Sequence, residues 1–553
     1  MAVTHSKLSG ALREQKPVRC IRDFIDHIAT ARRNHEPKVE IRFAKPAIRC
    51  DEATDILQLH FDQLRHLNQL HVEIRQPQNE LTDAFLNYTR AQLRKRDDYQ
   101  EWRSSEWSQL DKYEIQNMFG TPIPRPFAAI ILPFVWTYLM KEDPITGILK
   151  RKARTTCNGG KKYGKAVTVA ETCATCVEQP ACRVYWAMTA QLCLIAMGAD
   201  AGNAFAEAPP ATEPFYMRID DQFREWWTEC KGYPPIPPGY VLPVNHALQG
   251  HPEAPRLWER HIHDILVNKL QFVPTTHKKC LYSRRDSHDN LQMILRQVDN
   301  FSVSATEQQE CCTIIDKIGA HLTVPLNDLG IIRKFNGVNV QQTKWYIKIS
   351  CEDYLMKILL HHEWTQLKAS DLPIPMRSDS QYQRDLETAD RPKTPAEQTH
   401  IQQQAGFSYR TATGELIYAL IVARMDISFA IIKLSQFSAN PALVHYKALR
   451  QIFAYLNHTR EDGLIYWRPR PRDDLPELPP PSPRSNPHNR LSPHPQTPMS
   501  LLAYSDSDWG SDTSHRRSVS GTIILISGAA VLFSTKYQKA VALSSMPYTC
   551  NQS

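Results

Sequence analysis

Several short apolar runs along the chain have the length and composition of β-strands. The run from Phe127 to Trp136 predicts a strand and is too short to cross a bilayer. The run Leu192–Met197 predicts a buried strand that delivers Asp200 at its end. Between residues 295 and 304, two β-prone halves flank Asp299-Asn300, which predicts a hairpin with these two residues at its turn. Further strand-like runs follow at Thr522–Ile526 and Ala529–Phe533.

Apolar residues recur at helical spacing elsewhere. Residues 51–74 predict a helix, and residues 416–423 and 448–456 predict packed helices with a core role and no chemistry. The apolar positions are Leu57, Phe61, Leu64 and Leu67 in the first stretch, Leu416, Ile417, Leu420, Ile421 and Ala423 in the second, and Ala448, Ile452, Tyr455 and Leu456 in the third. Periodicity alone therefore predicts a mixture of α and β structure.

Length and composition indicate a modular chain. With 553 residues, 42% of them hydrophobic, it is long enough for roughly three or four compact units. Residues 371–405 are rich in Pro, Gln, Ser and Asp, and residues 468–500 hold eleven prolines, so both are expected to be connectors. The formal charge of +8 is modest, so any polynucleotide would be held by local basic strips.

The thirteen cysteines show no disulfide framework, and no signal peptide or transmembrane segment is expected. We therefore expect an intracellular protein, cytoplasmic or nuclear and not secreted. Cys173, Cys176 and Cys182 lack a fourth ligand at suitable spacing, which argues against zinc.

Candidate chemistry lies at Asp200 and Asp299. A carboxylate at a strand end and another at a hairpin turn could share divalent cations, as nucleotidyl transfer requires with two Mg²⁺ about 3.5–4 Å apart. Taken singly, each acid is more commonly a solvated turn residue.

A basic stretch runs from residue 150 to 165, with seven Lys or Arg and no acid. Asn158-Gly159-Gly160 could turn it into a hairpin that contacts phosphates. The alternative is an ordinary solvated basic loop.

The order of further motifs resembles the reverse transcriptase and RNase H part of a copia-type LTR retrotransposon polyprotein. The resemblance covers roughly residues 92–553. It rests on Asp200 through Phe205, Leu248 through Trp258, Gln297 through Asn300, Phe335 through Val338, Gly414 through Ile427, and Tyr504 through Trp509.

This resemblance implies the roles of individual residues. Asp200 and Asp299, helped by the Ala201 carbonyl, would hold two Mg²⁺ ions, and Phe205 would exclude the sugar 2′-hydroxyl. The nucleotide pocket would include Gln249 and Gly250, with Lys152 and Arg154 of the basic stretch contacting the nucleotide. The implied partners are an RNA template and a DNA primer or their RNA:DNA hybrid, together with deoxynucleoside triphosphates.

Two departures from the family pattern matter. Asn300 stands where the family carries a second Asp, so polymerase activity is expected to be strongly reduced or absent. In the RNase H region Asp506 matches the first acid, but no acidic residue follows Asp512 and the family's Glu-containing helix is missing. We expect RNase H to be inactive and its sheet to be left uncovered.

The fold implied by the resemblance is α+β: fingers and palm of antiparallel sheet with helices, a helical connection, and an incomplete RNase H-like α/β unit. The expected domains are an N-terminal extension of unknown role (1–91), fingers and palm (92–370), a linker (371–405), connection helices (406–467), a Pro-rich linker (468–500) and a truncated RNase H-like domain (501–553).

The sequence is compatible with three functions. The chain would be a reverse transcriptase fragment impaired by Asn300, a non-catalytic nucleic-acid-binding relic, or a decayed retroelement product.

Overall fold

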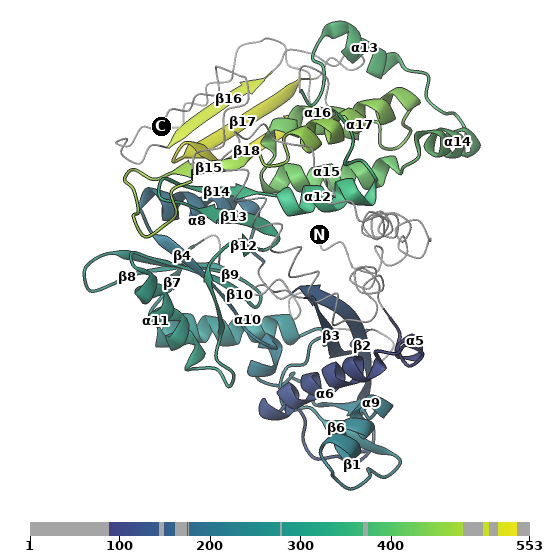
Figure 1. Cartoon of the computed structure of the whole chain (residues 1–553), viewed down its shortest axis with the longest axis vertical. Helices are drawn as coiled ribbons and strands as arrows, with labels where there is room; N and C mark the ends of the chain where they lie inside the picture. Colours follow the sequence, from purple (N-terminus) through teal and green to yellow (C-terminus); the bar gives the residue numbers. More distant parts are fainter. Residues whose placement is uncertain are drawn as a thin grey trace, which may run out of the picture. The chain divides into compact units, whose positions relative to one another are not determined.

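The computed structural model describes residues 88–142, 149–160, 174, 176–276, 279–368, 374–478, 501–507 and 518–538 (Figure 1). The helix expected over residues 51–74 lies outside these ranges. The chain divides into two compact units: the first comprises residues 1–171 and 209–254, and the second comprises residues 172–208 and 255–553.

The first unit is built on one mixed sheet. Its strands are β1 (Ile123–Pro124), β2 (Ile130–Glu142), β3 (Leu149–Cys157), β5 (Phe215–Arg218) and β6 (Tyr240–Pro243), and its helices are α5 (Arg90–Leu93), α6 (Tyr99–Ile115), α9 (Asp221–Glu225) and the π-helix η2 (Trp226–Cys230). The strand order is β1-β6-β5-β2-β3. Only the β2–β5 pair is parallel; the other pairs in the sheet are antiparallel.

The strand predicted over residues 127–136 is confirmed as part of β2, but it begins later. Phe127 is fully exposed and Ala128 has a φ of 56°, so the chain is still turning at these residues. Further along β2, Tyr138 is buried and packs edge-on against the fully buried Trp102 of α6. Its hydroxyl donates to the buried Glu106 carboxylate, which also accepts from Arg90. The polar groups of Tyr138, Glu106 and Arg90 are therefore paired with one another, as burial favours.

The second unit contains a six-stranded antiparallel sheet, which we label the palm sheet because its strands lie within residues 92–370, the range expected for fingers and palm. Its elements are α8 (Gln179–Gln191), β4 (Ile195–Asp200), η1 (Ala204–Glu207), α10 (Ala254–Asp264), η3 (Ile265–Lys269), β7 (Val273–Pro274), β8 (Leu281–Arg285), β9 (Leu291–Gln297), β10 (Asn300–Ala305), α11 (Gln308–Gly319) and β11 (Asn327–Ile331). The strand order is β11-β4-β10-β9-β8-β7.

Helices cover both faces of the palm sheet. Tyr185 of α8 hydrogen-bonds Ser302 of β10 at 2.8 Å. The sulfur of Cys312 in α11 lies 3.8 Å from the sulfur of Met197, which is the cross-strand neighbour of Val303. Because Ser302 and Val303 are consecutive strand residues, their side chains point to opposite faces. The near-continuous burial of β4 and β10 follows from this cover.

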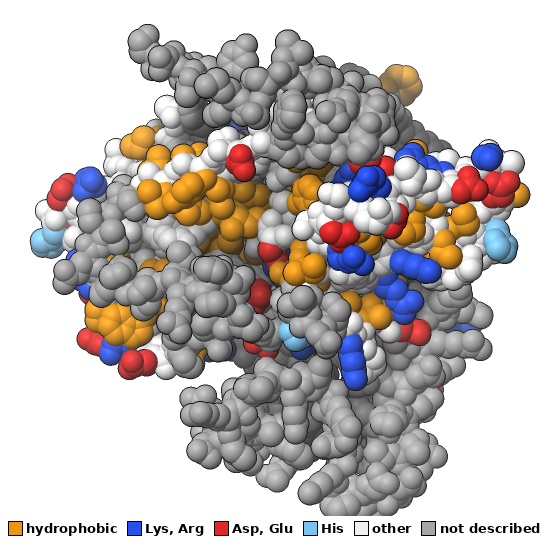
Figure 2. All heavy atoms as spheres, turned by 90° about the horizontal axis from the view of Figure 1, so that it is seen from above, with side chains coloured by type: hydrophobic (Ala, Val, Ile, Leu, Met, Phe, Trp, Pro, Cys, Tyr) orange, Lys and Arg blue, Asp and Glu red, His pale blue; other side chains and the backbone are white. Residues whose placement is uncertain are grey.

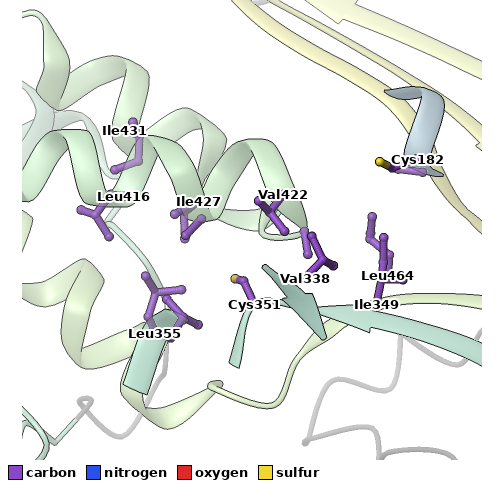
Figure 3. Close-up of a cluster of buried hydrophobic side chains, with 14 of the residues drawn as sticks. Cys182, Val338, Ile349, Cys351, Leu355, Leu416, Val422, Ile427, Ile431 and Leu464 are labelled. Carbon is purple, nitrogen blue, oxygen red and sulfur yellow. The ribbon is translucent and has the colours of Figure 1, made fainter. Parts of the chain in front are cut away.

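A second antiparallel sheet and a set of helices complete the core of this unit. The elements are β12 (Lys334–Phe335), β13 (Val338–Gln342), β14 (Tyr346–Ser350), α12 (Glu352–His361), α13 (Ser380–Thr388), α14 (Pro395–Ala405), α15 (Tyr409–Val422), η4 (Met425–Ile427), α16 (Ser428–Ser435), α17 (Leu443–His458) and β15 (Gly463–Trp467). Strand β14 pairs with both β13 and β15, which lies more than a hundred residues later in the chain. Figure 3 shows part of the shared core, in which Val422 from the helices lies beside Val338 from the strands.

The helices expected around residues 416–423 and 448–456 are confirmed as parts of α15 and α17. The apolar stripe of the first is not wholly buried, since Ile417 and Ile421 are 38% and 48% exposed.

The segment 371–405 differs from the irregular connector expected from its composition. From residue 374 it is described, and it contains α13 and α14, whose first turns are capped by Asp379 and Thr394. Each capping side chain accepts a hydrogen bond from a backbone N–H of the first turn, and Pro395 fits the first helical position. Local capping thus forms helices where the polar composition predicted a linker.

His445 of α17 is fully buried and makes two hydrogen bonds, one with Ala442 at the N-cap of its own helix and one with Leu386 of α13. Its Nδ1 accepts from the Ala442 N–H at 2.8 Å, and its Nε2 lies 2.7 Å from the Leu386 carbonyl oxygen, so the ring is held neutral with its proton on Nε2. Burial lowers the pKa of His445 to about 4, partly offset by the Leu386 carbonyl.

The stability of the second unit is therefore expected to depend on His445 in mildly acidic solution. The unfolded histidine has a pKa near 6.5, so its contribution is fully present above that value and is lost as the pH falls toward 4. The free energy of unfolding in urea should fall between pH 7 and pH 4 in the parent chain. This fall should be smaller in His445→Gln by up to about 3 kcal/mol. His400→Gln, at an exposed histidine of α14, is the matched control and should keep the parent pH dependence.

Three C-terminal strands form an antiparallel sheet in the order β16-β17-β18. They are β16 (Leu502–Ser507), β17 (Val519–Ile526) and β18 (Ala529–Tyr537). The strand runs expected at residues 522–526 and 529–533 are thus confirmed.

The expectation that this sheet is left uncovered is wrong for β18. Arg183 of α8 is buried, donates from Nε to the Val531 carbonyl at 2.9 Å and stacks on the Phe533 ring, while Ala530 is fully buried in the core of the second unit. Helices α8 and α16 pack against β18. Both precede these strands in the chain, whereas such cover was expected only from helices that follow them. Every residue of β16 is exposed. Figure 2 shows several groups of hydrophobic side chains on the face seen from above. The exposed apolar residues of these strands include Leu502, Tyr504 and Leu532.

The first part of the predicted Pro-rich linker is also held to this unit. Arg472 donates to the carbonyls of Cys193 and Thr306 at 2.7 and 2.6 Å, and the Pro476 carbonyl accepts from the Lys344 N–H. Residues 479–500 lie outside the described part of the chain.

Candidate active site

Asp200 ends β4, between the two strands that pair with β4 in the palm sheet. Its cross-strand neighbours are Asn300, the first residue of β10, and Asn327, the first residue of β11. Directly opposed residues of antiparallel strands have Cβ atoms about 4.5–5.5 Å apart on the same face. Asp200 is therefore flanked by an amide side chain on each side.

The hairpin that carries Asp299 turns one residue earlier than predicted. Because Asn300 pairs with Gln297, the two turn residues are Val298 and Asp299, and Asn300 belongs to the strand. Val298 has a φ of 56°, which a β-branched residue adopts only under strain. The Trp258 indole N–H holds the turn by donating to the Val298 carbonyl at 2.7 Å. The prediction that Asp-Asn supplies the positive φ is therefore wrong, because the positive φ falls on Val298, whose carbonyl accepts from Trp258.

The two predicted acids lie at one end of the palm sheet. The Ala201 N–H donates to the Asp299 carbonyl at 2.9 Å, which joins the turn to the residue after Asp200. Asn300 Nδ2 donates to the Asp299 carboxylate oxygen Oδ1 at 3.0 Å. Asp200, Asp299 and Asn300 are each partly exposed, so solvent and a ligand can reach them.

These residues offer a limited donor set for a divalent cation. Two carboxylates and the Ala201 carbonyl are hard oxygen donors of the kind that Mg²⁺ prefers, and substrate phosphates commonly complete its shell. Within the described ranges there is no group of three or more His, Cys, Asp or Glu side chains that could hold a metal. The set fits a divalent ion held jointly with a phosphate ligand, with one negative charge fewer than three acids would give.

Phe205 lies in the short 3-10 helix η1, five residues after Asp200, and is partly exposed. The turn into η1 uses Asn203 in the left-handed region, with a φ of 51°. Glu207 at the end of η1 is buried, and its carboxylate accepts from the backbone N–H groups of Thr323 and Val324 at 2.6 and 3.2 Å. Glu207 was not among the residues predicted from the sequence, where the available signal was a lone acid in the otherwise apolar run Ala204–Pro209.

The other predicted nucleotide-contacting residues lie in the first unit, around β3. The Gln249 carbonyl accepts from the Cys157 N–H at 2.8 Å, so Gln249 and Gly250 adjoin the end of β3. Lys152 and Arg154 alternate along β3 with the buried Ala153 and are partly exposed. The first unit thus brings all four of these residues to the β2–β3 hairpin and its neighbouring loop. Residues 161–165 of the basic stretch lie outside the described ranges.

Of the remaining predicted motifs, the structure describes the turn at residues 335–338 and Asp506. Asn336 and Gly337 form a two-residue hairpin turn with φ values of 50° and 77°, as a type I′ turn requires. Asp506 lies in the exposed strand β16 and accepts from the Ser507 N–H, while Asp508 and Asp512 fall outside the described residues. Cys173 of the zinc alternative is likewise not described. Among the described helices, none combines the length and hydrophobicity of a membrane span.

Residues 123–376 match the family model described as "Reverse transcriptase (RNA-dependent DNA polymerase)". Over 413 residues the chain is 24% identical to the Retrovirus-related Pol polyprotein from transposon TNT 1-94 of Nicotiana tabacum, covering 74% of this chain and 27% of that protein. Over 307 residues it is 26% identical to a putative transposon Ty5-1 protein of Saccharomyces cerevisiae, covering 55% of this chain and 84% of that protein.

Among solved structures, the foamy viral protease-reverse transcriptase in complex with dsDNA aligns with 79% of this chain and 67% of that chain, with a TM-score of 0.35 and 12% identity. This structural similarity is low, and the sequence matches carry the relationship. The chain spans about a quarter of the length of the tobacco polyprotein, 27% of it. Asp200, Phe205, Gln249 and Asp299 all fall inside the matched region 123–376.

Proposed function

The chain belongs to the copia-type reverse transcriptases, and from this premise we propose that its palm sheet carries an RNA-directed DNA polymerase site weakened by Asn300. The observation that supports the proposal best is the joining of Asp200 and Asp299 at one sheet end through the Ala201 N–H. Asp200 ends β4, and Asp299, 99 residues later, lies in the turn directly before the adjacent strand β10.

In this proposal, Asp200 and Asp299, with the Ala201 carbonyl, hold Mg²⁺ together with the triphosphate of a deoxynucleotide. When bound, the metal pair would activate the primer 3′-hydroxyl and neutralise charge on the triphosphate. Phe205 follows on η1, where its ring would restrict space at the sugar 2′ position. The prediction that Gln249, Gly250, Lys152 and Arg154 contact the nucleotide is part of this proposal, and the template would be RNA paired to a DNA primer.

Asn300 reduces the charge available to this site. An amide contributes one neutral oxygen, whereas a carboxylate contributes a full negative charge close to the metal. Asn300 Nδ2 also donates to Asp299, which occupies an oxygen that a metal would use. Both effects lower the affinity of the site for divalent cations, so the polymerase is proposed to be slow or inactive at ordinary Mg²⁺ concentrations.

Primer extension tests this proposal. The Asn300→Asp variant is expected to extend a DNA primer on an RNA template roughly 10- to 100-fold faster than the parent chain in Mg²⁺, because it restores one charge at the metal site. The measurement is single-nucleotide incorporation over a Mg²⁺ titration.

Asn290→Asp is the control, since it adds the same charge in the turn between β8 and β9, at the far end of the hairpin from Asp299. It should leave incorporation at the parent rate. Rapid incorporation by the parent chain, equal to that of Asn300→Asp, would refute the impairment. Absence of incorporation by both chains, with hybrid binding retained, would favour the alternative of a non-catalytic nucleic-acid-binding relic.

For the C-terminal sheet we propose no RNase H activity. The support is the single matched acid, Asp506, on the fully exposed strand β16. A nuclease of this kind needs several carboxylates around paired metal ions.

A further inference from the structure

Asn327 is the second cross-strand neighbour of Asp200, on the side opposite Asn300. The pairing places both side chains on one face of the palm sheet. The Nδ2 atom of Asn327 lies 3.8 Å from the position that a Cβ atom on Gly202 would occupy. The amide of Asn327 therefore extends along the chain segment that leaves Asp200, where the candidate metal site is formed.

Two contacts fix this position of Asn327. The buried Glu207 carboxylate accepts from the Thr323 and Val324 N–H groups and so ties the segment before β11 to η1, which follows Asp200. Directly after Asn327, a β-bulge between Asp328 and Gly330 shifts the register, and the Asp328 carboxylate closes it by accepting from the Gly330 N–H at 2.8 Å. Bulges of this kind occur beside active sites, where they direct a side chain or end the pairing.

We propose that Asn327 is a positioning residue for the Asp200 carboxylate and thereby for a divalent cation at this site. This inference rests on the proposed function. An amide N–H that donates to a carboxylate holds it in one rotamer and leaves its other oxygen directed at the ligand. Partners that orient a metal-binding carboxylate in this way commonly change metal affinity by about 10- to 100-fold when removed.

Under this proposal, Asn300 and Asn327 have separate roles at the site. Asn300 Nδ2 is engaged with Asp299, so it serves that carboxylate. Asn327 serves Asp200 from the edge strand β11. Asn300 donates to Asp299 in the structure, and under the proposal Asn327 would donate to Asp200 from the strand on the opposite side of β4.

Binding of Mn²⁺ alone to the full chain tests the inference without any requirement for catalysis. Free Mn²⁺ is measured by electron paramagnetic resonance during a titration. Asn327→Ala is expected to raise the dissociation constant roughly tenfold, and Asn327→Asp is expected to lower it because it places a charge beside Asp200. The control is Gln341→Ala, an exposed amide on β13 in another sheet, which should bind as the parent chain does. Thermal unfolding of each variant establishes that it is folded.

The outcomes separate the two proposals. If Asp200→Asn abolishes Mn²⁺ binding while both Asn327 variants bind like the parent chain, the role of Asn327 is overturned and the metal site stands. If Asp200→Asn leaves Mn²⁺ binding unchanged, the metal site of the proposed function falls, and the role of Asn327 falls with it. A purely structural role for Asn327 would weaken binding in both Asn327 variants, which also counts against the proposal.

Discussion

Replacing Gly250 with alanine is expected to unfold the junction between Gln249 and β3 and to destabilise the first unit by about 3 kcal/mol or more. A Cβ atom at this residue would lie 2.0 Å from the Cys157 carbonyl oxygen and 3.0 Å from its carbonyl carbon. Both contacts are with backbone, so no side chain can rotate away. Gly250 also has a φ of 98°, which side-chain-bearing residues rarely adopt.

Hydrogen exchange at the Cys157 amide reports on this change directly. In the parent chain that N–H donates to the Gln249 carbonyl and should be protected; in Gly250→Ala its protection should be lost. Gly232→Ala is the matched control, since Gly232 also has a positive φ, of 69°, but a Cβ atom there would meet no atom within 4 Å. The control should cost only about 1 kcal/mol, the backbone penalty alone. Equal losses in the two variants would show that the Cys157 contact contributes nothing.

Local patterns predicted a buried strand that ends in Asp200 and a hairpin that carries Asp299, whereas only the resemblance of the ordered motifs to a family placed the two acids in one site. It did not predict which two residues turn. Propensity favours Asp-Asn for a positive φ, whereas the structure places that φ at Val298, where Trp258, 40 residues earlier, donates to its carbonyl. Tertiary contacts of this kind override local preference, and they have no signature in a short window of sequence.

The same limit applies to Glu207 and Arg183. Each is a charged residue in an apolar stretch, and each has its partners more than a hundred residues away, at Thr323 and at Val531. Hydrophobic periodicity predicts that a strand or helix exists but not which distant backbone groups its polar residues will satisfy. For that reason the sheet β16-β17-β18 was expected to be uncovered, although α8 was already present in the sequence to pack against it.

Substitution of Asp200 by asparagine is expected to reduce primer extension in the Asn300→Asp background by about a thousandfold or more, equivalent to roughly 4 kcal/mol of lost transition-state stabilisation. Asp200 lies at the centre of the row Asn327, Asp200, Asn300, so its replacement leaves Asp299 as the only original carboxylate at the proposed metal site. The change is nearly isosteric, and β4 is held by strands on both sides, so the fold should persist. The rate of single-nucleotide incorporation is measured together with thermal unfolding.

Asp328→Asn in the same background distinguishes a local charge effect from a general one. Asp328 is adjacent to Asn327 on β11, but it pairs with Ala199 and so projects from the other face of the palm sheet. An asparagine there keeps an oxygen that can accept from the Gly330 N–H, so the bulge survives and extension should stay within about twofold of the background, because no charge near the metal is lost. Because the two substitutions remove the same charge from neighbouring strands, a loss as large in Asp328→Asn as in Asp200→Asn would mean that extension responds to the total charge of this sheet end, and the assignment of Asp200 as a metal-binding residue would fail.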